Sequence, residues 1–143
     1  MSILQKTLVP MCPEGIDLVR HPLPVYPHNK LILTDEDGTE VAETLGDAPA
    51  VLLLGHGAAT VGKDLIQSGM NMFQLEEQAR MNWYAYCAAG PGYPRIPEEL
   101  IVEERDKPRM DELPHFKGAL EQAGPVRARC AWQAYTGAVT GDM

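Results

Sequence analysis

The segment from Ala50 to Leu54 constrains the fold more than any other part of the sequence. Its five consecutive residues are all apolar, and a glycine follows at once. Such a run is typical of a strand that is covered on both faces, because a strand with one wet face alternates apolar and polar residues. The sequence therefore predicts an α/β fold, a three-layer α-β-α sandwich around a central mixed sheet.

A long helix is expected from Asp64 to about Ala89, after a further short strand at 58–61. Asp64 is a favourable N-cap residue, and Gly90 and Pro91 are placed to end the helix. One face of this helix carries a stripe of mostly apolar residues spaced by three and four positions, which is the helical period. The stripe consists of Leu65, Gly69, Met72, Glu76, Ala79, Trp83 and Cys87.

The segment between residues 31 and 46 is predicted as a strand, a turn and a helix. Leu31–Thr34 is the strand, 35–38 the turn, and 39–45 the helix, with Gly46 ending it. Further helices are expected at 97–104, 116–123 and 127–135. The sheet so predicted has few strands, which indicates a fold that is incomplete without a partner half.

Residues 1–30 contain five prolines and are predicted to form an extended N-terminal segment. Proline removes a backbone donor and disfavours the helical conformation of the residue before it. We expect this segment to lie along a partner rather than on its own core.

Charge and composition exclude several classes of function. The chain has 12 Lys and Arg against 20 Asp and Glu, a net charge of −8, with no basic cluster. This disfavours binding to nucleic acid or to an anionic membrane. No apolar run approaches the roughly 20 residues of a membrane span. The first residues also lack the apolar core of a signal peptide, so we expect no export.

Length and cysteine content indicate one intracellular domain. A chain of 143 residues is the size of a single domain, here residues 1–143. The three cysteines are far apart, which excludes a disulfide framework and a CxxC motif and fits a reducing cytoplasm.

Two segments resemble ligand-binding loops without matching them fully. Residues 57–64 nearly fit the phosphate loop G-x-x-x-x-G-K-[ST], but Asp64 stands where a hydroxyl should hold magnesium. The alternative is a tight glycine turn with Asp64 capping the helix. Residues 35–38 resemble a calcium loop, but an EF-hand would require an acid at Leu33. A simple turn is the preferred interpretation there.

The triplet Gly55-His56-Gly57 is the strongest candidate for a functional site. A histidine follows a buried strand, and the flanking glycines let the backbone come close to a ligand. The alternative is a turn histidine satisfied by a backbone carbonyl. Glu76 lies within the helical stripe, and an ion pair with Arg80, four residues on, is expected. A contact of Glu76 near His56 is the other possibility.

The order of several motifs resembles the class II aldolase/adducin family. These motifs are Pro24-Val25-Tyr26, a Leu-Gly-Asp turn at 45–47, the strand and His-Gly pair within 50–63, and Leu75-Glu76-Glu77-Gln78-Ala79-Arg80. The resemblance covers about half of the chain, from Pro24 to about Tyr93.

The resemblance implies a metal-dependent carbon–carbon lyase, a decarboxylase or an aldolase. Catalytic members bind a divalent metal, usually zinc, through three histidines, and His56 matches the last of these. The metal acts as a Lewis acid while a carbon–carbon bond breaks. A C-terminal tyrosine can reach a neighbour's site in the ring-like oligomers of the family, and Tyr135 is a candidate for this catalytic role. The decarboxylase branch is preferred, because no phosphate loop is found.

The chain departs from the family in having no His-x-His pair. A catalytic zinc site needs about three protein ligands. We therefore expect a second chain to carry the N-terminal half, in a homo- or hetero-oligomer acting on a small molecule. Two alternatives stay open: a non-catalytic, adducin-like assembly subunit, and a nucleotide-binding protein.

Overall fold

The computed structural model describes residues 2–4, 6–108, 112–116 and 126–141. For residues 126–128 and 140 it describes the backbone only. The chain divides into two compact units, Met1–Ile96 and Pro97–Met143. The first unit contains the sheet and the candidate site. The second contains α4 (Glu98–Asp106) and α6 (Val126–Thr140).

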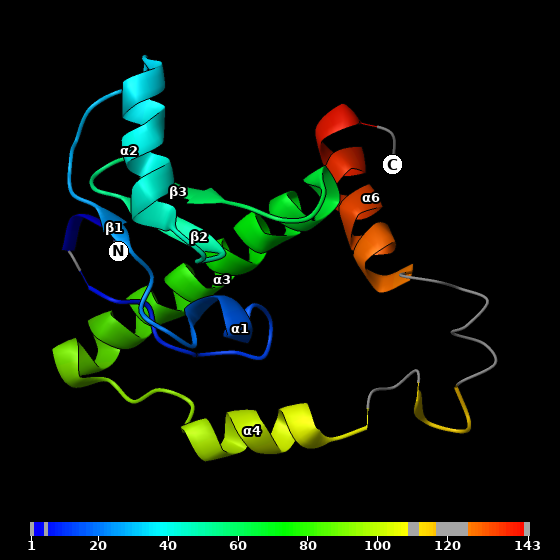
Figure 1. Ribbon diagram of the computed structural model, residues 1–143. Coiled ribbons are helices and arrows are strands. Elements are labelled where there is room, and N and C mark those ends of the chain that lie inside the picture. Colours follow the sequence, from blue (N-terminus) through cyan, green and yellow to red (C-terminus); the bar gives the residue numbers. More distant parts are fainter. Residues whose placement is uncertain (1, 5, 109–111, 117–125, 142–143) are drawn as a thin grey trace. The chain divides into compact units, whose positions relative to one another are not determined.

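A three-stranded mixed sheet forms the centre of the first unit (Figure 1). Its strands, in spatial order, are β1 (Val25–Tyr26), β2 (Ala50–Leu53) and β3 (Gly57–Thr60). β1 runs parallel to β2, and β2 runs antiparallel to β3, so that Leu52 is paired with residues of both neighbours. The predicted α/β class, with a mixed sheet, is confirmed, while the complete sandwich stays a prediction.

Helices pack against this sheet and against one another. α2 (Asp35–Leu45) packs against β1 and β2, whereas α3 (Leu65–Ala89) packs against β3 and the short α1 (Ile16–Val19) (Figure 1). Two 3-10 turns, η1 (Ser2–Leu4) and η2 (Gly90–Gly92), complete the unit. The central strand is buried as expected, since Ala50 and Val51 are fully covered.

The N-terminal segment supplies much of the core, contrary to the expectation that it lies along a partner instead. The core cluster consists of Leu8, Leu18, Val19, Leu23, Ala50, Leu52 and Leu75. The prolines do keep most of residues 1–30 irregular, with β1, α1 and η1 as its only regular elements among the described residues. The apolar residues between the prolines are nevertheless buried.

The predicted strand at Leu31–Thr34 and the predicted turn at 35–38 are wrong. Leu33 is 80% exposed, and α2 begins four residues earlier than expected. Thr34 and Asp37 form a capping box: the Thr34 hydroxyl accepts a hydrogen bond from the Asp37 backbone, and the Asp37 carboxylate accepts one from Thr34 N. This cap and the acidic first turn outweigh the strand propensity of the apolar residues before it. The end of the helix at Gly46 is confirmed.

The long helix is confirmed, but its buried face is not the predicted stripe. The Asp64 carboxylate accepts a hydrogen bond of 2.7 Å from Gln67 N and caps α3 as expected. The buried residues of α3 are Leu75, Gln78 and Asn82. In contrast, Leu65 is 77% exposed and Trp83 48% exposed.

The second unit bears out two predicted helices. α4 follows Pro97 directly, and α6 contains the segment expected at 127–135. The helix expected at 116–123 lies outside the described residues, apart from its first position. No helix in the described part of the chain combines the length and the apolar character that crossing a membrane requires.

Candidate functional site

His56 lies in the tight turn that joins β2 to β3. Its backbone N–H donates a hydrogen bond of 3.0 Å to Leu53 O, which closes a four-residue turn. Gly55, the third residue of this turn, has φ +73°, as a type II turn requires. A Cβ atom on Gly55 would also lie 2.9 Å from the side-chain nitrogen of Asn29, but it is the positive φ that makes the position favour glycine. The sequence thus fixes His56 at the exposed end of a buried strand.

His56 is exposed to solvent. His21, His28 and His115 are exposed loop residues, as predicted. Within the ranges that the structure describes, no three His, Cys, Asp or Glu side chains lie close enough to hold a metal ion. The described residues alone therefore do not fit a complete divalent-metal site.

An open pocket of about 250 Å³ lies beside this turn. Gly57, the residue after His56, is part of its wall. Leu52 of β2 and Leu75 of α3 form part of its apolar lining, and among the described residues Glu76 is the only charged side chain at the pocket. The other lining residues are Ser2, Leu8, Ala58, Met72 and Ala79. The arrangement is a largely apolar hollow with a carboxylate, next to an exposed imidazole.

The predicted ion pair between Glu76 and Arg80 is wrong. Arg80 pairs with Glu77, and this hydrogen bond is the first cause that raises the pKa of Arg80. Positions three and four residues before an arginine are both within its reach on a helix. Because Glu77 takes the guanidinium, the Glu76 carboxylate is left at the pocket.

Gln78 and Asn82 hold the N-terminal segment onto α3, a role that the sequence reasoning missed. Both side chains are 0% exposed. Gln78 accepts a hydrogen bond from Met11 N (3.0 Å) and donates to the carbonyls of Cys12 (2.8 Å) and Glu14 (2.7 Å). These three contacts give an irregular backbone the partners that a sheet would otherwise supply.

Asn82 repeats this arrangement one helical turn later. Its carboxamide accepts from Val9 N (2.9 Å) and donates to Val9 O (2.8 Å), while the Tyr93 hydroxyl donates to its oxygen (2.5 Å). We call Gln78 and Asn82 the amide clamp. Other amide residues of α3, such as Gln67 and Asn71, also lie four positions apart, so the sequence carried no distinct signal for this role.

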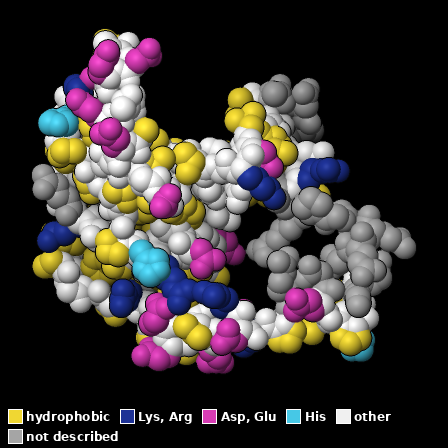
Figure 2. Space-filling view, in the orientation of Figure 1, with side chains coloured by type: hydrophobic (Ala, Val, Ile, Leu, Met, Phe, Trp, Pro, Cys, Tyr) yellow, Lys and Arg dark blue, Asp and Glu magenta, His cyan; other side chains and the backbone are white. Residues whose placement is uncertain are grey.

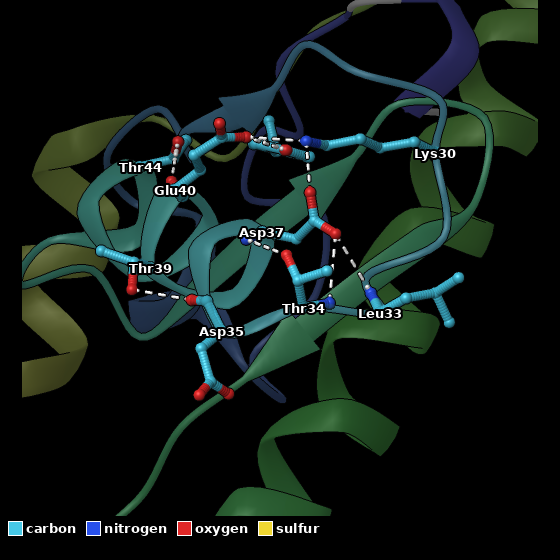
Figure 3. A network of polar contacts seen from close by, with 9 residues as sticks. Lys30, Leu33, Thr34, Asp35, Asp37, Thr39, Glu40 and Thr44 are labelled. Atoms are coloured by element: carbon cyan, nitrogen blue, oxygen red, sulfur yellow. Dashed lines mark hydrogen bonds and ion pairs between the residues drawn. The ribbon is translucent and has the colours of Figure 1, made fainter.

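A second polar network joins the start of α2 to β1 (Figure 3). Lys30 Nζ contacts Asp37 at 2.5 Å and Glu40 at 3.0 Å, and the buried Tyr26 hydroxyl donates to Glu40 at 2.6 Å. Lys30 is the main cause that lowers the pKa of Asp37 to about 2. The hydrogen bond from Tyr26, followed by that from Lys30, lowers the pKa of Glu40.

This second network is structural rather than a cation site. Figure 2 shows acidic side chains gathered along α2, and the lysine in Figure 3 already neutralises two of them. Residues 35–38, compared above with a calcium loop, form the first turn of a helix. Their carboxylates interact favourably with the positive end of the helix dipole.

The phosphate-loop interpretation of residues 57–64 does not agree with the structure. The first four of these residues form β3 and pair with β2, so they do not wrap around a phosphate. Gly62 is needed for a different reason, since a Cβ there would lie 2.6 Å from Ser68 N at the start of α3. Asp64 is the helix cap, which was the alternative interpretation.

Tyr135 lies on α6 in the second unit and is 45% exposed. Its assignment as a catalytic group therefore stays a prediction, and so does that of His56 as a metal ligand.

Comparison with known proteins adds two findings. The profile of the family described as "Class II Aldolase and Adducin N-terminal domain" matches residues 1–83. A 3,4-dihydroxyphthalate decarboxylase of Rhodococcus jostii (strain RHA1) is 37% identical over 76 residues. That match covers 53% of this chain and 31% of the relative, so the chain corresponds to about a third of the relative's length.

Proposed function

Because this chain belongs to the class II aldolase and adducin family, we propose that it forms part of a metal-dependent carbon–carbon lyase. Class II aldolases generally use a divalent metal. A decarboxylase is preferred to an aldolase, since the similar Rhodococcus protein is a decarboxylase. The observation that carries the proposal is the exposed His56 at the end of buried β2, beside a largely apolar pocket.

His56 would supply one ligand to this metal, for which we propose zinc. A catalytic zinc site takes about three protein ligands, and the described residues bring no such group together. We assign the remaining ligands to a second polypeptide that carries the N-terminal part of the domain. Members of the family are commonly oligomeric and bind small-molecule substrates, which agrees with this assignment.

The metal, when bound, would stabilise negative charge on a substrate oxygen while a carbon–carbon bond breaks. The role of this chain would be to position His56 and to exclude water from the site. The closed turn holds the His56 backbone, and the glycines on either side leave room for a substrate. The apolar wall formed by Leu52 and Leu75 would keep water from one side of the site. Tyr135 would contact the substrate in a neighbouring subunit, and the free cysteines agree with a cytoplasmic location.

Reconstitution tests this function. The chain is produced alone and together with the part of the Rhodococcus relative that lies outside the match. Bound metal is measured by mass spectrometry. Activity is measured as the release of CO₂ from 3,4-dihydroxyphthalate. We expect bound metal and activity only in the joint preparation. His56→Ala should abolish both, whereas the control His21→Ala, which changes another exposed histidine, should keep both. Absence of metal from both wild-type preparations would overturn the proposal.

A second candidate is a non-catalytic assembly subunit, as in adducin-like proteins. The observation that favours it is the large apolar surface that α3 exposes. This function predicts stable self-association without metal and no effect of His56→Ala on it.

A further inference from the structure

The loop that follows β1 and the turn that follows β2 lie at the same edge of the sheet. β1 and β2 are parallel, with Tyr26 paired to Leu53, so their carboxyl ends point in one direction. Asn29 lies three residues beyond Tyr26, and His56 lies three residues beyond Leu53. In α/β sheets, ligands bind in the crevice beyond the carboxyl ends of the strands. The topology therefore places Asn29 at the same ligand-binding edge as His56.

A direct contact joins these two segments. A Cβ atom built on Gly55 would lie 2.9 Å from Nδ2 of Asn29 and 3.4 Å from its Cγ, so the Asn29 carboxamide packs over the backbone of Gly55. Gly55 is the residue directly before His56. The Asn29 carboxamide thus occupies the space that a side chain at position 55 would take, beside the turn that carries the candidate metal ligand.

Two anchors hold the loop that carries Asn29. On one side the Tyr26 ring is buried, and its hydroxyl donates a hydrogen bond of 2.6 Å to Glu40. On the other side Lys30 forms ion pairs with Asp37 and Glu40 (Figure 3). Asn29 is therefore restrained by fixed residues three positions before it and one position after it. The polar network on α2 thereby positions this asparagine.

The Asn29 carboxamide is available to a ligand. Its side chain is exposed and has no hydrogen-bond partner elsewhere in the residues that the structure describes. A carboxamide carries two N–H donors and a carbonyl acceptor. The ammonium group of the next residue, Lys30, is already paired with two carboxylates. Asn29, rather than Lys30, is therefore the donor available to an anionic oxygen at this edge.

We propose that Asn29 is a substrate-binding residue of the His56 site, and that its Nδ2–H donates a hydrogen bond to a carboxylate of the substrate. The proposal rests on the proposed function, because a decarboxylase acts on a carboxylic acid. A donor bound to the carboxylate that leaves as neutral CO₂ would stabilise the substrate more than the transition state. Asn29 is therefore assigned to a second carboxylate, which stays on the product, and it selects acids that carry one.

Nuclear magnetic resonance tests this binding with the chain alone and without metal. Phthalate, an aromatic dicarboxylate, is titrated into the ¹⁵N-labelled chain. The side-chain amide signals of Asn29 are identified as those absent from Asn29→Asp. We expect these signals and the backbone amide signal of His56 to shift together with phthalate, and not with its uncharged dimethyl ester.

Charge at position 29 should control the affinity for phthalate. Asn29→Asp keeps the size of the side chain but should weaken binding by about tenfold or more, because a donor is lost and the new carboxylate repels the ligand. Gln133→Glu adds the same charge at an exposed position of α6 and should leave the affinity unchanged. Absence of the shift, or equal affinity of the wild type and Asn29→Asp, would overturn the assignment.

Steady-state kinetics in the joint preparation separate binding from chemistry. Asn29→Ala should raise KM in the decarboxylation assay about tenfold, while kcat and bound metal stay close to those of the wild type. His56→Ala, in contrast, should lose the metal. A lower kcat at unchanged KM in Asn29→Ala would contradict the proposed role. If the joint preparation is inactive, the lyase function fails, whereas the phthalate titration still decides whether Asn29 binds a carboxylate.

Discussion

Replacing Gln78 with leucine should release the N-terminal segment from α3. The side chain is completely buried and makes three hydrogen bonds to backbone groups of that segment. A buried hydrogen bond contributes about 1 kcal/mol net, and leucine is close to glutamine in size, so little cavity forms. The expected loss is about 3 kcal/mol, a large part of the 5–15 kcal/mol that stabilises a typical domain.

Urea unfolding followed by circular dichroism measures this loss. With a slope near 2 kcal/mol per molar urea, the midpoint should fall by about 1.5 M. Gln133→Leu, at an exposed position of α6, is the matched control and should change stability by less than about 0.5 kcal/mol. If both variants unfold at the same urea concentration, the clamp contributes no net stability and the reasoning fails.

Three further predictions concern α2 and the start of α3. The pKa of Asp37 is lowered from 3.8 to about 2, mainly by Lys30. The ionised Asp37 side chain therefore contributes to stability above about pH 4, and this contribution is lost as the pH falls toward 2. Melting temperatures from pH 5 to 2 should therefore fall more steeply for the wild type than for Asp37→Asn; equal slopes would contradict this. Gly62→Ala should cost about 1–3 kcal/mol in calorimetry because the new Cβ meets the backbone of α3, whereas Gly92→Ala, which meets nothing within 4 Å, should be close to neutral. Asp64→Ala should remove the cap of α3 and cost about 1 kcal/mol in urea unfolding, and Asp64→Asn should restore most of it.

The sequence predicted the elements whose signals are local and strong. The apolar run at Ala50 and the cap at Asp64 located β2 and α3 correctly, because burial and capping leave direct marks in a sequence. The start of α2 was misplaced, since Leu31–Leu33 has strand propensity and the capping box at Thr34 was not recognised. Here a local cap outweighed intrinsic preference.

The candidate site was only partly predictable. The position of His56 in a turn after a buried strand follows from its flanking glycines. Which face of α3 is buried could not be read from periodicity, because Gln78 and Asn82 are buried to bind a backbone 64 to 73 residues away. Hydrophobic patterning assumes that polar residues face water, and the amide clamp reverses that assumption.

The amide clamp also sets an order of events in folding. The backbone of Val9 finds its partner only at Asn82, 73 residues later. At a synthesis rate of about 5–20 residues per second, the N-terminal segment waits roughly 4 to 15 s before that partner has been made. Its apolar residues, among them Leu8, have no core to join during this time. The N-terminal segment is synthesised well before α3 and is thus among the last parts of this unit to become ordered. Closing the long loop between them belongs to the slow, non-local part of folding.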